Sequence, residues 1–424
     1  MSHPLDALSL NVLQSAVARS GAAFRARVVL DPAGGLGDKV FPPTYASDRE
    51  PTKYAVEKRR VGDEEELTVL LDSVASQANR MEEALLTAWR ERGLDIPVVT
   101  VDFTAQPGIE DVGEITSLQA PHRLADAILR DSVLDGKPFR ASDLGRAFTD
   151  ATPRNATAVY TLAPHALIFG MWDSTGPKGG LGSKFQRALV SEIVGVAATA
   201  GVKVGSRIDP LAIPSSIPVF AAGSDPRDWV IDEAEAARDK GKPVPFTRKG
   251  ADKSGKPSTL NHGNVTPSID HKSGGVTIRE AVQTSVLSLV ALRRLQFQTD
   301  AAGGRIAPES RPAAELAART ALAALGLAAM ALGREQGYDL RSRALLIPRG
   351  PLVVELVGVD GDLTSFRLTG DEAVVLVQEA AAAAAANGLS WEREPARLVP
   401  APKLAALVRE ARKLAELGGD DEQE

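Results

Sequence analysis

Strand-like and helix-like segments follow one another in an irregular order along this chain of 424 residues. A doubly wound sheet needs a regular repeat of strand and helix, so the pattern predicts an α+β fold instead. We expect strands at residues 24–30, 98–103, 158–172, 202–208, 217–220, 274–278, 351–359 and 363–368. We expect helices at residues 65–92, 121–131, 184–196, 279–295, 312–334, 371–387 and 403–417.

Two long segments, residues 31–62 and 240–275, are predicted to be irregular. From residue 240 to residue 280 there are eight Lys and Arg residues against three acids, a local balance of +5. A solvated loop and a functional insertion both agree with this composition. The chain ends in GGDDEQE, residues 418–424, which we expect to be an acidic disordered tail.

The overall charge gives no sign of a nucleic-acid or membrane partner. There are 49 Lys and Arg residues against 55 Asp and Glu residues, a formal net charge of -6. A site for an anion must therefore be local. The absence of cysteine excludes disulfides, thiolate zinc sites and thiol catalysis, and suits a reducing cytoplasm. The longest apolar run, residues 320–333, is too short for a membrane span, and no secretory signal is expected at the N-terminus, so we expect a cytoplasmic protein.

The stretch FGMWDSTGPKGGLGSKFQRALVSEI, residues 169–193, suggests a site for an anion. Ser183 and Gln186 match an S-x-x-Q capping box, which predicts a helix that begins at Lys184 and exposes Arg187 in its first turn. Cations are unfavourable beside the free N–H groups of a helix N-terminus unless an anion joins them. The glycines before the helix would let the backbone approach that anion, and the candidate residues here are Lys178, Gly179, Gly180, Lys184 and Arg187.

This stretch carries no nucleotide-binding fingerprint. The spacing of G-x-x-x-x-G-K-[ST] fails, and G-x-G-x-x-G is absent. A structural turn with surface lysines is the alternative interpretation. We expect Phe169 and Trp172 to be buried in the core.

Two other segments could also contact an anion. His122 and Arg123 lie in the first turn of the helix predicted at residues 121–131, where the dipole again disfavours a cation. Asn261, His262 and Asn264 surround Gly263 inside the basic segment. A turn that satisfies its own hydrogen bonds is the alternative explanation for this second group.

Evidence for catalysis in the sequence is weak. The five histidines show neither H-x-H nor H-E-x-x-H spacing, and no G-x-S-x-G motif is present. Asp173 is the one acid close to the predicted anion site. We therefore predict no catalytic residue, no metal site and no cofactor.

Five segments in the range 117–297 resemble one protein family, in the same order. They are SLQAPHRLADAILRDS, FGMWDSTGPKGGLGSKFQRALVSEI, GSRIDPLAI, LNHGNVTPSI and GGVTIREAVQTSVLSLVALRRLQF. The family is the RAMP-superfamily backbone subunit of type I-G (formerly I-U) CRISPR Cascade, the Csb-one branch of the Cas-seven family. Outside that range the resemblance is thin.

The resemblance implies a modified RRM, or ferredoxin-like, palm with large insertions. The palm would occupy residues 1–310 with insertions at about 31–62 and 240–275, either of which is long enough to form a projecting thumb. Ala-rich helices and additional strands at residues 311–417 would pack on the palm, ahead of the tail.

The resemblance also implies a function. Several copies of such a subunit line up along one CRISPR RNA, and the guide, not the protein, reads the target DNA. The partners would be the CRISPR RNA, the target DNA through the guide, other copies of the chain, and the large and guide-end subunits of Cascade. Type I backbones are not nucleases, so no enzyme is expected. RNA would be held through its backbone by Lys178, Gly179, Gly180, Lys184, Arg187, His122, Arg123, Asn261, His262 and Asn264.

Two alternatives remain open from the sequence. One is an enzyme that acts on a phosphorylated small molecule or nucleotide, with Asp173 or His122 in acid-base catalysis. The other is a metal-dependent RNA nuclease like the subtype III backbone subunits.

Overall fold

The chain folds into two compact units in the computed structural model, which describes residues 5–46, 51–176, 182–247 and 254–418. The first unit comprises Met1–Pro43, Ala55–Thr199 and Thr277–Leu414. The second unit comprises Thr44–Tyr54, Ala200–Val276 and Ala415–Glu424. Each unit is described separately below.

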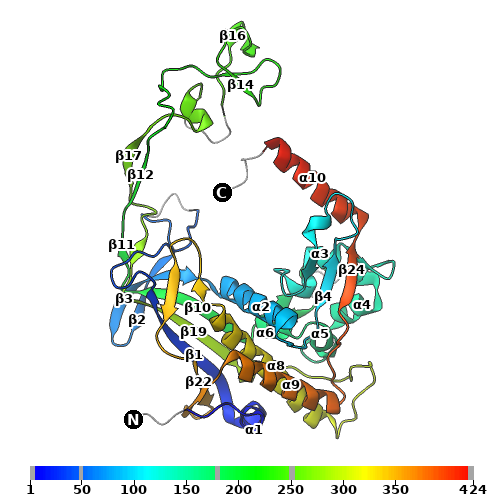
Figure 1. Cartoon of the computed structure of the whole chain (residues 1–424). Helices are drawn as coiled ribbons and strands as arrows, with labels where there is room; N and C mark the ends of the chain where they lie inside the picture. The colour runs from blue at the N-terminus through cyan, green and yellow to red at the C-terminus, as the bar shows by residue number, and fades with distance from the viewer. Residues whose placement is uncertain (1–4, 47–50, 177–181, 248–253, 419–424) are drawn as a thin grey trace. The chain divides into compact units, whose positions relative to one another are not determined.

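The first unit is built on a large antiparallel sheet, in which nine strands lie within the described residues (Figure 1). The strand order is β2-β3-β10-β19-β1-β21-β20, and β22 pairs with both β1 and β23. The strands are β1 (Gly21–Pro32), β2 (Val56–Val61), β3 (Glu64–Asp72), β10 (Leu189–Val196), β19 (Glu280–Ser288), β20 (Tyr338–Asp339), β21 (Leu345–Pro348), β22 (Val353–Gly358) and β23 (Leu363–Arg367).

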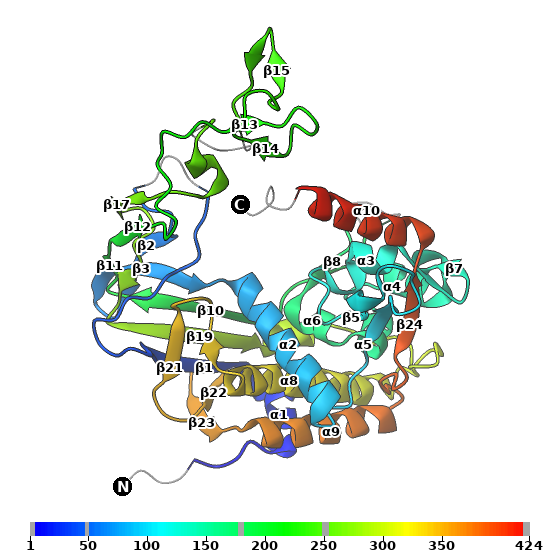
Figure 2. The same ribbon diagram turned by 45° about the horizontal axis from the view of Figure 1, so that its top comes forward.

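Helices cover this sheet and complete the core (Figures 1 and 2). Helices α2 (Val74–Glu91) and α8 (Arg311–Glu335) pack against the sheet and against each other, and α9 (Gly370–Ala386) packs on α8. The Ala-rich sequence of α8 lets its neighbours approach closely, and Leu322, Leu325 and Leu327 are fully buried. Near the N-terminus lie α1 (Leu10–Ser15) and the π-helical turn Ala16–Ser20, and α7 (Leu289–Arg293) follows β19.

Helix α8 is long and apolar enough to cross a membrane by length and composition alone. In the structure, 83% of its most apolar window is buried inside the protein. Burial of this kind is what the central helix of a folded core requires.

A smaller sheet and several short helices form the rest of the first unit. The sheet has the order β5-β4-β24-β6-β7, with β24 parallel to β4. Its strands are β4 (Val99–Asp102), β5 (Glu114–Thr116), β6 (Ser132–Leu134), β7 (Lys137–Pro138) and β24 (Ala396–Pro400). The short helices are α3 (Ala127–Arg130), α4 (Asp143–Asp150), α5 (Thr157–Leu162), α6 (His165–Phe169) and the 3₁₀ turns Glu110–Val112, Arg123–Ala125 and Phe139–Ala141. The longer helix α10 (Pro402–Gly418) follows β24 and belongs to the first unit as far as Leu414. A hairpin of β8 (Met171–Trp172) and β9 (Lys184–Phe185) follows α6.

The second unit consists of short two-stranded ribbons. Strand β12 (Lys203–Arg207) pairs with β17 (Val265–Asp270), β13 (Phe220–Ala221) with β14 (Trp229–Val230), and β15 (Arg238–Asp239) with β16 (Lys242–Pro243). Val219, Ala221 and Phe246 form a small core, next to the 3₁₀ turn Pro257–Leu260. Strands β11 (Thr199–Ala200) and β18 (Val276–Thr277) lie where the chain passes between the units.

The α+β prediction is confirmed, as are helices α8, α9 and α10 and strands β1, β4, β12, β22 and β23. Other predicted elements are wrong. The helix predicted at 184–196 is β9 followed by β10, and the helix at 279–295 is β19 followed by α7. The strand at 158–172 is α5, α6 and β8, and the helix at 121–131 is only the 3₁₀ turn Arg123–Ala125 and α3. The helix at 65–92 is confirmed in its second part as α2, whereas its first part is β3. The likeness to an RRM palm and the boundary at residue 310 stay predictions.

The error at β10 has a simple geometric cause. Phe185, Leu189 and Ile193 recur every four residues, which places them on one face of a helix. Four is also a multiple of two, so the same spacing places Leu189 and Ile193 on one face of strand β10. All three side chains are buried in the structure, and β10 is paired on both sides, with β3 and β19.

Candidate functional site

A cleft of about 620 Å³ lies in the first unit, between α2, the turn before residues 123–125, the end of α6 and the β8–β9 hairpin. It brings together four of the predicted anion-binding residues, which are far apart in the sequence. We call it the basic cleft and define it by His122, Arg123, Lys184 and Arg187. Its walls also include Asn79, Phe169, Gly170, Trp172 and Ser174.

The β8–β9 hairpin presents an aromatic ring and a cation to the basic cleft. Met171 pairs with Phe185 and both are buried, whereas the next pair, Trp172 and Lys184, is exposed. Side chains alternate across a strand, so the pairing itself places Trp172 and Lys184 on the same open side. The Nζ atom of Lys184 lies 4.8 Å from the centroid of the Trp172 ring, a cation–π contact.

The helix N-terminus predicted at Lys184 does not exist. Because Lys184 lies in β9, the Ser183–Gln186 capping box is wrong, and no free amide groups of a first helical turn stand beside the cation. The positive charge of the cleft comes from side chains and not from a helix dipole. Lys178, Gly179 and Gly180 lie outside the described residues.

Arg187 is held at the cleft by its own backbone neighbours. Its Nε donates a hydrogen bond of 3.1 Å to the carbonyl of Phe169. Gly170 has a φ of +84°, and a Cβ there would lie 2.8 Å from Cγ of Arg187. In the part of the chain that the structure describes, the terminal nitrogens of Arg187 form no hydrogen bond or ion pair, so they can bind an anion.

Arg123 is not the free cation that the sequence predicts. Its guanidinium is buried and donates to both carboxylate oxygens of Glu82, at 2.7 and 2.6 Å. It also donates to the carbonyl of Gly170 at 2.9 Å and lies over the ring of Phe169. Burial raises the pKa of Glu82, and the charge of Arg123 opposes that rise. Arg123 therefore connects α2 to the end of α6 and stabilises the lining of the cleft.

His122 lies next to Arg123 but remains exposed at the rim of the cleft. Its backbone N–H donates to Oδ2 of Asp126 at 3.0 Å, which fixes the turn. The side chain is therefore presented to the cleft from an anchored backbone.

Asn261, His262 and Asn264 belong to the second unit, and their hydrogen bonds fit the alternative of a self-satisfied turn. Asn261 adopts a left-handed conformation with a φ of +58°. The Oδ1 atom of Asn264 accepts from the N–H of Asp209 at 2.7 Å. Oδ2 of Asp209 in turn accepts from the N–H of Gly263 at 2.6 Å.

Trp172 is a residue of the cleft that the sequence does not single out as a site residue. Phe169 is buried as predicted, but Trp172, also predicted to be core, is 51% exposed. No local pattern could have shown this, because Asp173, which lies on the same side of the strand as Met171, is an acid whose burial depends on its partner Arg140. Asp173 is fully buried, and its carboxylate is paired with Arg140. Asp173 therefore stabilises the β8–β9 hairpin and does not contact a ligand in the cleft.

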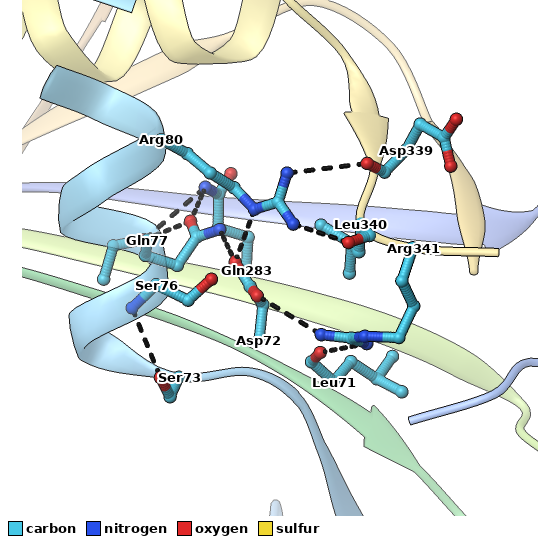
Figure 3. A network of polar contacts seen from close by, with 11 residues as sticks. Leu71, Asp72, Ser73, Ser76, Gln77, Arg80, Gln283, Asp339, Leu340 and Arg341 are labelled. Carbon is cyan, nitrogen blue, oxygen red and sulfur yellow. Dashed lines mark hydrogen bonds and ion pairs between the residues drawn. The ribbon is translucent and has the colours of Figure 1, made fainter. Parts of the chain in front are cut away.

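A buried polar network fixes α2, which forms one wall of the cleft (Figure 3). Oδ2 of Asp72, at the end of β3, accepts from Nε2 of Gln77 at 2.6 Å and from Nε of Arg80 at 3.0 Å. The side chain of Gln77 also accepts from Nε2 of Gln283 on β19 at 2.7 Å. The hydroxyl of Tyr338 donates to Oε1 of Gln283 at 2.8 Å.

Further bonds attach the same network to the chain beyond β20. Arg80 donates to the carbonyl of Leu340 at 2.6 Å, and Arg341 donates to the carbonyl of Leu71 at 2.8 Å (Figure 3). Helix α2 is thus bonded to β3, β19 and the segment after β20, and its residues Asn79 and Glu82 face the cleft and Arg123. Among the residues that the structure describes, no group of three or more His, Asp or Glu side chains is placed to hold a metal ion.

Residues 24–200 match the family model described as CRISPR-associated protein GSU0053 (Cas_GSU0053). The matched segment contains α2, the turn at His122, α6 and the β8–β9 hairpin, so it contains every wall of the basic cleft. No curated protein matches the chain. The comparison therefore shows similarity to a CRISPR-associated protein family over the segment that builds the cleft.

Proposed function

We propose, from the match of residues 24–200 to a CRISPR-associated family, that this chain is the CRISPR RNA-binding backbone subunit of a type I-G Cascade complex. Several copies would line up along one guide RNA and support recognition of target DNA by pairing with the guide. The observation that carries the proposal is the meeting of Lys184, Arg187 and His122 around one cleft inside the matched segment.

Lys and Arg side chains at such a cleft suit the phosphates of a single-stranded RNA. Phosphate contacts hold a nucleic acid without reading its sequence, which is what a subunit that binds many different guides requires. A local cluster of cations also reconciles RNA binding with a net charge of -6. Other copies of the chain and the large and guide-end subunits would be its protein partners in the cytoplasm. We propose no catalytic role for the chain.

Salt-dependent RNA binding tests this proposal. In titrations of the purified chain with single-stranded RNA, log K should fall linearly with log salt concentration, and each lost phosphate contact should reduce the slope by about 0.7. We expect Lys184→Ala and Arg187→Ala each to produce that reduction. Lys137→Ala and Arg154→Ala, which remove exposed cations outside the cleft, are the matched controls. A slope that is the same in both cleft variants and in wild type would exclude the cleft as a phosphate site.

The size of the cleft also agrees with a second function, an enzyme that acts on a phosphorylated small molecule. Small-molecule sites commonly measure about 300–1,000 Å³, and the basic cleft falls in this range. Purification of the chain together with its operon separates the two. RNA of uniform length that copurifies supports the backbone subunit, whereas stabilisation by nucleotides without RNA supports the enzyme. Regular cleavage of complementary RNA by the assembled complex with magnesium would instead indicate a nuclease.

A further inference from the structure

We infer that Trp172 is a stacking platform for one nucleobase of the bound RNA, and that Lys184 and Arg187 hold the neighbouring phosphates. The inference rests on the proposed function, because it names how the basic cleft binds RNA. Phosphate binding alone requires no contact with a nucleobase, so stacking on Trp172 is an additional contact.

The position of Trp172 in the cleft is the first argument. A single exposed aromatic residue on a protein surface needs no explanation by itself. Trp172, however, lies in the wall of a concave site whose other exposed side chains include two cations, Lys184 and Arg187. An aromatic face beside a positively charged groove is the arrangement by which proteins bind single strands without sequence preference.

The backbone that carries the ring is fixed on both sides. Before Trp172, the buried Met171 pairs with Phe185. After it, the N–H of Asp173 donates to the carbonyl of Ser183 at 2.8 Å. The hairpin therefore fixes the backbone from which the indole projects before any ligand arrives, which lowers the entropy that binding must overcome.

A buried ion pair reinforces this hairpin. The carboxylate of Asp173 is paired with Arg140, and Arg140 also donates to the carbonyl of Thr175 at 2.9 Å. Gly176 packs so closely on this carboxylate that a Cβ would lie 2.2 Å from Oδ2 of Asp173. Arg140 and Asp173 are thus positioning residues for the platform.

The contact between Lys184 and Trp172 shows that the face of this ring is open to a cationic group. Every nucleobase has a π face, so stacking on Trp172 would tolerate any guide sequence. The ammonium of Lys184 lies over the ring, so a base that stacks on this face would displace it toward the neighbouring phosphate, with which it can form a charge-assisted hydrogen bond. Trp172 and Lys184 would therefore contact the base and the neighbouring phosphate of one nucleotide.

The test compares two ligands on the full chain: a single-stranded RNA of about 12 nucleotides and the same sugar-phosphate strand made entirely of abasic sites. Wild type should prefer the RNA with bases. Trp172→Ala should weaken binding of that RNA by about tenfold to hundredfold and leave binding of the abasic strand unchanged. The salt slope should stay at its wild-type value, because stacking releases no counterions. Trp172→Phe should retain most of the preference, and Trp229→Ala, which removes another half-exposed tryptophan, should retain all of it.

A second measurement makes the result independent of the alanine variant's folding. Tryptophan emission is recorded during titration with RNA for wild type and for Trp172→Phe, which keeps Trp89, Trp229 and Trp391. Stacking predicts quenching in wild type that Trp172→Phe largely loses. The stacking platform is wrong if Trp172→Ala prefers the RNA with bases as strongly as wild type does, or if RNA quenches Trp172→Phe as much as wild type. Salt-dependent RNA binding would in that case still support the proposed function. No RNA binding by wild type at low salt overturns both.

Discussion

The guanidinium of Arg123 donates hydrogen bonds of 2.7 and 2.6 Å to the carboxylate of Glu82, a residue 41 positions earlier in the chain. Both side chains are almost completely buried. A third bond, to the carbonyl of Gly170, connects the pair to the end of α6. The two residues therefore connect α2 to the end of α6, and both of these elements line the basic cleft.

Removal of one partner should be much more harmful than removal of both. Glu82→Leu leaves a buried guanidinium without its carboxylate, and we expect it to lower the free energy of unfolding by about 3–5 kcal/mol. The double variant Glu82→Leu/Arg123→Met leaves no unpaired charge and should recover a large part of that loss. Urea unfolding of the three proteins measures the difference. Equal losses in the single and double variants would show that the ion pair is not what stabilises this connection.

The buried imidazole of His165 should make the stability of the first unit depend on pH. The imidazole is fully buried in α6, and a contact of 3.2 Å joins its Nε2 to the carbonyl of Ser117. Burial, assisted by the charge of Arg123, lowers the pKa of His165 to about 3. The unfolded chain, with an ordinary value near 6.5, binds the proton more readily between these two pH values.

Stability should therefore fall as the pH is lowered from about 6.5 toward 3, by at most about 1.4 kcal/mol per pH unit from this residue. His165→Gln keeps a donor for Ser117 and removes the titration. Urea midpoints measured at several pH values should thus decline less steeply for His165→Gln than for wild type. Parallel curves would mean that His165 is not the source of the slope.

Much of the fold could be predicted from the sequence, because its long elements carry strong periodic patterns. Helix α9 even has the capping box that a helix start requires, formed by Thr369 and Glu372. The central strands β10 and β19 were mistaken for helices. Their apolar residues fit both periods, and only the pairing with β1 and β3 decides between them.

The site was predictable by residue type and not by geometry. His122, Lys184 and Arg187 are candidate anion-binding residues by their type alone, and the structure gathers them at one cleft. The physical reason given for Lys184, a helix N-terminus, was wrong. The pairing of Arg123 with Glu82 depends on the packing of α2, so no local pattern around residue 123 could have revealed it.

Gly170 should not tolerate a side chain. Alanine there would meet two penalties, a backbone conformation that is essentially restricted to glycine (φ +84°, ψ 155°) and a Cβ within 2.8 Å of Arg187. Gly136 also has a positive φ, +76°, with open space around it, so Gly136→Ala reports the cost of a positive φ without a steric contact, about 1–2 kcal/mol. We expect Gly170→Ala to lower the melting temperature more than Gly136→Ala and also to weaken RNA binding, since it displaces Arg187. Equal effects of the two substitutions would show that the close approach to Arg187 carries no cost.

The polar network beneath α2 gives the last prediction. Tyr338 donates its hydroxyl hydrogen to Oε1 of Gln283, and Gln283 donates to Gln77 on α2, in a region where all three side chains are buried. Tyr338→Phe leaves a buried acceptor without its donor, which should cost about 1–3 kcal/mol of unfolding free energy. Tyr45→Phe, at an exposed tyrosine, is the matched control and should change stability little.

The network bonds to the side of α2 that faces away from Asn79, a residue that lines the cleft, so Tyr338→Phe should also shift α2 and weaken RNA binding. A variant that loses stability but binds RNA as wild type does would show that the network supports the core and not the site.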